Sequence, residues 1–201
     1  MNNICLIGDI LVDVALKKNN EDLKMRLGGI IHSARALWAI SSSYSLGYIS
    51  PTYLDSRISN YIFHYGNPAF VKVAETLNAP NLILIEEVRE IGDQGYELIL
   101  RNNVKYKYLD FTLPQCDSIL ITSGQYNISE VLNKIGDYPV SIELANMNYN
   151  DFTNLDFRFR NIYISTSSEI FKTYIKNKSF SFESFASLFK GHCDLLIFKE
   201  N

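Results

Sequence analysis

Residues 4–13 of this chain read Ile4-Cys5-Leu6-Ile7-Gly8-Asp9-Ile10-Leu11-Val12-Asp13. The apolar run that ends at Gly8 predicts a buried strand, and the loose alternation from Ile10 to Leu16 predicts a second one. The pair Gly28-Gly29 then precedes apolar residues that share one helix face, namely Ile31, Ala34, Leu37, Trp38 and Ile40. A buried strand followed by an amphipathic helix is the unit from which α/β folds are built.

The same alternation of short apolar strands and amphipathic helices returns further along the chain. Strands are predicted at 45–49, 118–121, 140–142, 162–164 and 195–198, and helices after Ser50-Pro51 and at 129–135, 169–176 and 181–190. This order predicts an α/β fold with a mainly parallel sheet flanked by helices. Ligands of such sheets bind at the carboxyl ends of the strands.

Residues 67–108 differ in character from the segments on either side. Apolar runs at 82–85 and 96–100 flank the turn Gly92-Asp93-Gln94-Gly95, and 104–109 could add a third strand. Residues 69–76 fit a helix or a strand equally well. We interpret 67–108 as a β-rich insertion in a single domain that spans 1–201.

The composition of the chain is that of a globular protein and argues against several other classes. The chain has 201 residues, 47% of them hydrophobic, and a net charge of −3 from 19 Lys+Arg and 22 Asp+Glu. This is an ordinary globular composition without a basic footprint for nucleic acid or an anionic membrane. The N-terminus does not resemble a signal peptide, and no stretch of about 18 apolar residues predicts a membrane span. Cys5, Cys116 and Cys193 are too far apart to indicate a zinc ribbon or a disulfide framework, so a reducing cytoplasm is the expected compartment.

Three groups of residues could carry chemistry. Asp13 could accept charge-assisted hydrogen bonds from ligand hydroxyls, or it could be a solvated turn residue. Gly28-Gly29 could bring backbone amides close to a ligand, or form a simple turn. Thr166-Ser167-Ser168-Glu169 favours a helix cap, in which Thr166 caps the helix and Glu169 reaches back, although Glu169 could instead order a hydrated metal ion.

Several familiar motifs do not occur in the sequence. The patterns GxGxxG, GxxxxGK[ST] and GxSxG are all missing, which argues against a dinucleotide fingerprint, a Walker P-loop and an α/β-hydrolase. His32, His64 and His192 lack the spacing of metal ligands. A lone histidine in a helix is more often structural than catalytic.

Taken in order, these features resemble the ribokinase/PfkB family of carbohydrate kinases. The likeness is carried by Gly8 to Asp13, by Gly28-Gly29 before a helix, by the strand Tyr44 to Tyr48, by the β-rich segment where that family has its lid, and by Thr166-x-x-Glu169 where the family has Asn-x-x-Glu. The resemblance implies a ribokinase-like fold whose lid comprises about 67–108 and part of 12–27. It also implies ATP-dependent phosphoryl transfer to a hydroxyl of a sugar, sugar phosphate or nucleoside.

The resemblance further implies roles for individual residues. Asp13, Gly28 and Gly29 would bind the substrate, together with Ser33, which stands where the family commonly has Asn. Glu169 would position Mg²⁺ through water. The lid would exclude water from phosphoryl transfer and could pair with a second copy to form a homodimer.

One feature of the family is absent from the sequence. Its Gly-Ala-Gly-Asp motif, which supplies backbone amides and the Asp that takes the hydroxyl proton, occurs nowhere in the 201 residues. We therefore expect a chain that is truncated at its C-terminus, with the catalytic Asp beyond Asn201 and little kinase activity of its own. ATP and Mg²⁺ are expected for the complete enzyme. A non-catalytic sugar-binding or regulatory protein on the same fold and an unrelated α/β protein remain alternatives.

Overall fold

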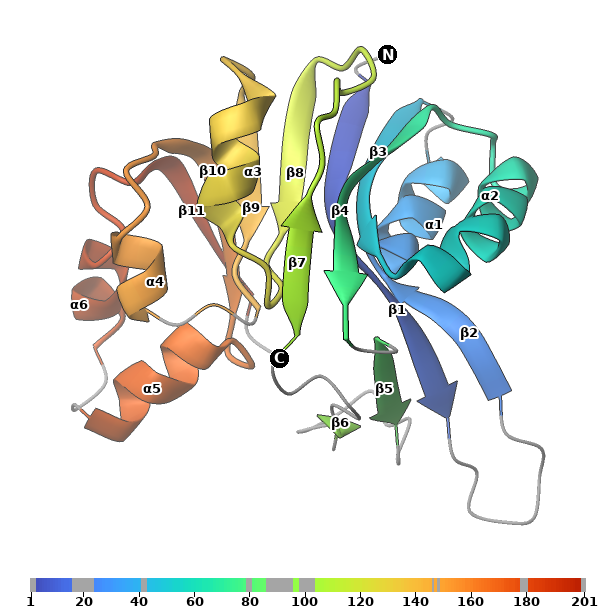
Figure 1. Cartoon of the computed structure of the whole chain (residues 1–201). Helices are drawn as coiled ribbons and strands as arrows, with labels where there is room; N and C mark the ends of the chain where they lie inside the picture. The colour runs from blue at the N-terminus through green and yellow to red at the C-terminus, as the bar shows by residue number, and fades with distance from the viewer. Residues whose placement is uncertain are drawn as a thin grey trace. The chain divides into compact units, whose positions relative to one another are not determined.

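A computed structural model describes residues 3–15, 24–40, 43–78, 81–85, 96–97, 104–145, 147, 149–177 and 181–199. The chain divides into two compact units, Met1–Cys116 and Asp117–Asn201. The helices and strands of both units carry the labels of Figure 1.

The first unit is built on β1 (Ile4–Ala15), a strand of 12 residues that takes part in two sheets. In the main sheet, the first half of β1 pairs in parallel with β3 (Tyr44–Ser50), β3 pairs in parallel with β4 (Phe70–Leu77), and β4 pairs antiparallel with β7 (Lys105–Tyr108). The helices α1 (Ile30–Ile40) and α2 (Asp55–His64), the latter preceded by the short helix η1 (Thr52–Leu54), lie side by side near β3 (Figure 1). Every residue of β3 is buried, as expected for a central strand of a parallel sheet.

The second half of β1 belongs to a smaller sheet. It pairs antiparallel with β2 (Lys24–Gly29) and in parallel with β5 (Leu82–Ile85), and β5 pairs antiparallel with β6 (Tyr96–Glu97). The change of partner on β1 falls between Asp9, opposite Ile49 of β3, and Ile10, opposite Gly29 of β2. We call β2, β5, β6 and residues 10–15 of β1 the second sheet.

Three local details of the first unit differ from the sequence-based expectations. Residues 4–15 form one strand rather than two, because the two halves find different partners along one continuous backbone. The insertion predicted at 67–108 is divided, since β4 and β7 join the main sheet whereas β5 and β6 join the second one. Ser50 does not cap the following helix. Its hydroxyl donates to Asp55 Oδ1 at 3.4 Å. The predicted turn at 92–95 lies outside the described residues.

The second unit holds four neighbouring parallel strands in chain order. They are β8 (Ser118–Thr122), β9 (Val140–Glu143), β10 (Phe159–Ser165) and β11 (Cys193–Lys199). The helices α3 (Ile128–Ile135), α4 (Tyr149–Thr153), α5 (Glu169–Asn177) and α6 (Phe182–Ser187) lie in the connections. Mostly parallel strands connected through helices confirm the predicted α/β class.

The core of the second unit is rich in aromatic rings. Phe152, Phe159, Phe185 and Phe189 are at most 1% exposed. The Phe185 ring lies 5.5 Å from Phe189 and the Phe152 ring 5.3 Å from Phe189, which links α4 and α6 through one cluster. Burial alternates along β8 and β9, so that one side of these strands packs in the core and the other side is half-buried.

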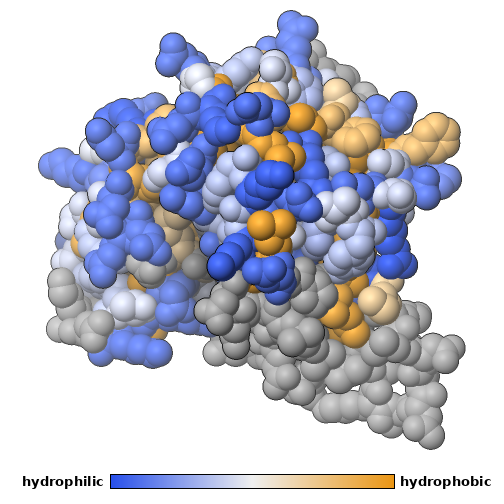
Figure 2. All heavy atoms as spheres, viewed as in Figure 1, coloured by the Kyte–Doolittle hydropathy of each residue, from blue (hydrophilic) through white to orange (hydrophobic). Residues whose placement is uncertain are grey.

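Within the described segments, no helix is both long enough and apolar enough to cross a membrane. On the face drawn in Figure 2, hydrophobic residues form small patches between hydrophilic ones. None of the three cysteines forms a disulfide bond with another, and Cys5 and Cys116 are buried.

Candidate functional site

The first cluster surrounds Asp13, in the half of β1 that belongs to the second sheet. Asp13 stands opposite Arg26 of β2, and Arg26 Nε lies 3.4 Å from Asp13 Oδ2. The same oxygen lies 2.9 Å from Nε2 of His32, in the first turn of α1. Asp13 is only 5% exposed. Its buried carboxylate is therefore compensated by a guanidinium and an imidazole of the same unit.

Gly28 is the residue against which the Asp13 carboxylate packs. A Cβ atom on Gly28 would lie 2.1 Å from Asp13 Oδ1 and 2.4 Å from Asp13 Cγ. These distances are far below van der Waals contact, so any side chain at position 28 would displace the carboxylate. The position of Asp13 thus explains why residue 28 is glycine.

Gly29 is held by a different part of β1. Its φ of +63° lies in the left-handed region, and a Cβ atom would lie 2.1 Å from the carbonyl oxygen of Asp9. A glycine in this conformation lets β2 end and α1 begin within one residue. Ser33 is half-buried in the first turns of α1. The structure therefore places Asp13, Gly28 and Gly29 together, with Ser33 on the adjoining helix.

His32 and Arg35 were not among the predicted site residues. Arg35 Nη2 lies 2.5 Å from His32 Nδ1. A guanidinium only donates, so Nδ1 must be the accepting nitrogen and Nε2–H must donate to Asp13. The available signal was the spacing of three between His32 and Arg35 just behind a glycine pair, which places both side chains on one helix face.

Asn81 is a second residue that the sequence did not single out. It is completely buried, and its Nδ2 donates to the carbonyl oxygen of Ile10 at 2.8 Å while its own carbonyl oxygen accepts from Val12 N–H at 2.9 Å. Its Oδ1 finds no hydrogen-bond partner among the described residues. Asn81 therefore fixes the backbone of β1 just before Asp13. Its buried Oδ1 could still accept a hydrogen bond.

A second cluster lies at the carboxyl ends of the strands in the other unit, where Glu169 begins α5. The Glu169 side chain is exposed, and its Oε1 accepts from Thr173 Oγ1 at 3.4 Å. The predicted cap from Thr166 to Glu169 is wrong, because the Glu169 N–H donates instead to Ala145 O at 3.1 Å. Ser168 takes the capping role, and its buried Oγ accepts from Phe171 N–H at 3.3 Å. The Glu169 carboxylate is left at the surface.

Glu143 ends β9 at the same edge and was missed by the sequence reasoning. Burial raises the pKa of its carboxyl to about 7. Ser123 ties this edge together, because its N–H donates to Glu143 O and its Oγ accepts from Ala145 N–H, both at 2.9 Å. No group of three His, Cys, Asp or Glu side chains within the described ranges could hold a metal ion. A hard cation at this edge would therefore keep several waters, as Mg²⁺ commonly does.

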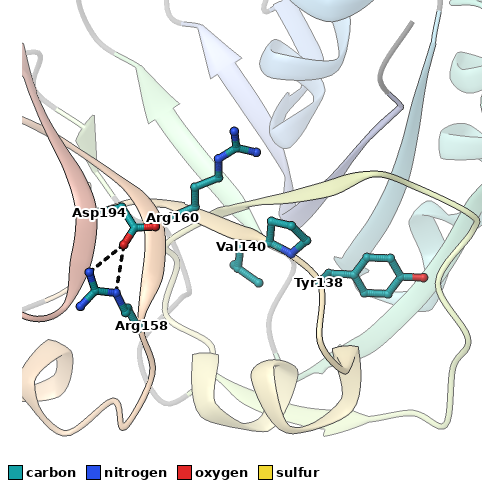
Figure 3. A pocket seen from close by; sticks show the side chains of 6 residues that line it. Tyr138, Val140, Arg158, Arg160 and Asp194 are labelled. Atoms are coloured by element: carbon teal, nitrogen blue, oxygen red, sulfur yellow. Dashed lines mark hydrogen bonds and ion pairs between the residues drawn. The ribbon is translucent and has the colours of Figure 1, made fainter.

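A hollow of about 290 Å³ lies elsewhere in this unit, at the amino-terminal ends of β9, β10 and β11 (Figure 3). It is lined by Tyr138, Pro139, Val140, Arg158, Arg160 and Asp194. Arg158 Nη2 donates to Asp194 Oδ1 at 2.7 Å, and both side chains are 61% exposed. Ligands of open α/β sheets bind at the opposite ends of the strands, so this hollow is not part of the candidate site.

Comparison with known proteins identifies solved structures that share this fold. No protein-family model and no curated protein matches the sequence. Among solved structures, a fructokinase double mutant from Vibrio cholerae, bound to fructose, ADP and potassium ion, has a TM-score of 0.67 and 12% identity, over 98% of this chain and 70% of that one. Adenosine kinase from Sinorhizobium meliloti has a TM-score of 0.62 and 9% identity, over 100% and 75%.

Ribokinase from Thermotoga maritima gives the same result. Its TM-score is 0.56 with 14% identity, over 100% of this chain and 72% of that one. Identities this low establish a likeness of fold. On the arrangement of its strands and helices and on these matches, the chain has the ribokinase/PfkB-like fold that its sequence predicted.

Proposed function

We propose that this chain binds a polyol, meaning a sugar, a sugar phosphate or a nucleoside, against Asp13. The observation that carries the proposal is the buried Asp13 carboxylate, which packs on Gly28 and is held by His32 and Arg26. A carboxylate whose orientation is fixed by its neighbours loses little entropy when it accepts a ligand hydroxyl. Gly28, Gly29 and Ser33 would line the same site. The fructose-bound structural neighbour supports this ligand class.

The reaction that we propose for this fold is ATP-dependent transfer of a phosphoryl group to a hydroxyl of the ligand. One structural neighbour contains fructose and ADP and another contains ATP, which supports a nucleotide as co-substrate. The second sheet would act as the lid, because water must be kept from the transferring phosphoryl group.

Mg²⁺ fits the carboxyl edge of the second unit. Glu169 offers an exposed carboxylate there, and Ser165, Thr166 and Ser167 beside it carry hydroxyl oxygens, the type of donor that Mg²⁺ and its waters prefer. Bound through water at Glu169, the ion would offset the negative charge of the nucleotide phosphates.

Binding without catalysis is the second candidate function. It is favoured by one observation, the absence of a Gly-Ala-Gly-Asp stretch from the 201 residues. Without that stretch the sequence shows neither an evident general base nor the usual amides for the transferred group. An ATP-turnover assay of the 201-residue chain with a panel of sugars separates the two. We expect little or no product, and robust turnover would instead support catalysis by this chain.

A thermal-shift and calorimetry experiment tests the binding proposal itself. Sugars, sugar phosphates and nucleosides are titrated into the wild-type chain and into Asp13→Asn, with the exposed Asp156→Asn as the matched control. Loss of a charged hydrogen-bond partner costs about 1.5–3 kcal/mol, so Asp13→Asn should weaken binding by roughly 10- to 150-fold while Asp156→Asn binds normally. Circular dichroism of the unliganded variants checks that they are folded. Binding that is equal in wild type and Asp13→Asn, or no binding of any polyol, would refute the proposal.

A further inference from the structure

The charges around Asp13 bear on the kind of polyol that the proposed site accepts. Asp13 carries one negative charge, Arg26 and Arg35 carry two positive charges, and His32 adds no negative charge. The next acidic side chain on this side of β1, Asp9, is four residues away, or about 13 Å along the strand. The cluster itself therefore has a net positive charge, which favours an anionic ligand.

Arg26 is the group of this cluster that solvent can reach. Its side chain is 53% exposed, whereas that of Asp13 is 7% exposed. Arg26 Nε lies 3.4 Å from Asp13 Oδ2, and Arg26 has no other partner among the described residues. A guanidinium has five N–H donors in a planar fork, so most of the donors of Arg26 remain available to a ligand.

Arg35 plays a different part. It is half-buried, and its contact with Nδ1 fixes the ring of His32 so that Nε2–H points at Asp13. The positive charge of Arg35 also reaches Tyr61, where it opposes the rise in pKa that burial causes. Arg35 is thus a positioning residue, which leaves Arg26 as the cation that can turn to a ligand.

A neutral polyol and a phosphorylated one would meet this cluster differently. Hydroxyls of a neutral polyol could bind Asp13 Oδ1, since His32 and Arg26 both approach Oδ2, but such a ligand would leave the guanidinium of Arg26 without an anionic partner of its own. A phosphate offers Arg26 a bidentate partner of higher charge than the carboxylate. The Nη groups of Arg26 can bind the phosphate while Nε stays beside Asp13, so the carboxylate keeps its orientation for the hydroxyls.

We infer that the ligand is a phosphorylated polyol, whose phosphate binds Arg26 while its hydroxyls donate to Asp13. This inference rests on the proposed function, because it assumes that Asp13 is the hydroxyl acceptor. It names the class of ligand within that function and assigns Arg26 as the residue that selects for it.

The experiment compares each polyol with its own phosphate ester on the 201-residue chain. The pairs are ribose and ribose 5-phosphate, fructose and fructose 6-phosphate, and adenosine and AMP, with inorganic phosphate as the anion control. We expect at least one ester to bind tenfold or more tightly than its parent, and this ratio to fall between 50 and 500 mM NaCl. Arg26→Gln should bring the ratio close to one, Arg26→Lys should retain part of it, and Arg57→Gln on α2 should leave it unchanged.

The outcomes separate this inference from the proposed function. Equal binding of esters and parents that still depends on Asp13 would overturn the inference and leave the proposed function standing. A preference for esters that survives in Arg26→Gln would overturn the role of Arg26. Inorganic phosphate that binds as tightly as the esters would show an anion site without polyol recognition and overturn the inference. If no polyol and no ester binds, the proposed function fails and the inference fails with it.

Discussion

Glu143→Gln should stabilise the protein at neutral pH and not at acidic pH. Burial raises the pKa of the Glu143 carboxyl from 4.5 to about 7. A carboxyl that holds its proton more tightly when folded binds more protons in the folded state between these two values, so stability falls as pH rises. Glutamine mimics the protonated form and carries no such cost. The two proteins should therefore be equally stable at low pH and diverge as pH increases.

The size of the divergence follows from the shift of about 2.5 pH units between 4.5 and about 7. At 1.36 kcal/mol per unit it amounts to about 3 kcal/mol above pH 7, and the solvent that reaches this half-buried side chain makes that value an upper limit. In a chain of this size the corresponding rise in Tm is roughly 6–12 °C.

Urea denaturation followed by far-UV circular dichroism at pH 4.5, 6 and 8 measures the difference. The exposed Asp156→Asn, outside the helices and strands, is the matched control, and it should track the wild type at every pH. A stability difference that is the same at pH 4.5 and 8, or one in which Glu143→Gln is the less stable protein at pH 8, would refute the reasoning.

Three further predictions concern packing and thiol chemistry. Gly29→Ala should lower the free energy of unfolding in urea by about 1–3 kcal/mol, because position 29 has a positive φ and a Cβ atom there would clash with the Asp9 carbonyl oxygen. A change below about 0.5 kcal/mol would contradict this. Phe152→Ala should cost about 3–5 kcal/mol in the same assay because Phe152 is 0% exposed, and a normal Tm would show that the aromatic cluster repacks. In a native thiol titration Cys193 should react first and Cys5 should stay protected, since burial raises the pKa of Cys5 to about 12, so fast labelling of Cys5 would argue against its burial in β1.

The fold was predictable because its signals are local. The apolar runs of β8 to β11 and the helical spacing of the segments between them are readable without knowledge of the partners. A glycine pair is also visible in the sequence alone, so Gly28-Gly29 could be identified as a candidate. What the sequence could not supply was the reason for each glycine, since Asp13 fills the space at Gly28 and a carbonyl oxygen fills that at Gly29.

The missed residues share one property, which is that their meaning depends on contacts distant in sequence. His32 matters because it reaches Asp13 on another strand, and Asn81 matters because it fixes the backbone of β1. Glu143 looks like any strand-ending carboxylate until its burial is known. Thr166 fitted a local capping pattern, but a backbone contact from Glu169 to Ala145 replaced it. Local rules fail where a tertiary contact competes for the same hydrogen bond.

The continuity of β1 has a mechanical consequence. Asp9 still pairs with the main sheet and Ile10 already pairs with the second one, so no unpaired residue separates the two sheets at this strand. A free hinge is therefore missing at this crossing, and tilting one sheet against the other must bend a hydrogen-bonded strand or break its pairing. Asp13 lies only three residues past this stiff joint. A force that bends either sheet would therefore move the Asp13 carboxylate relative to its partners Arg26 and His32.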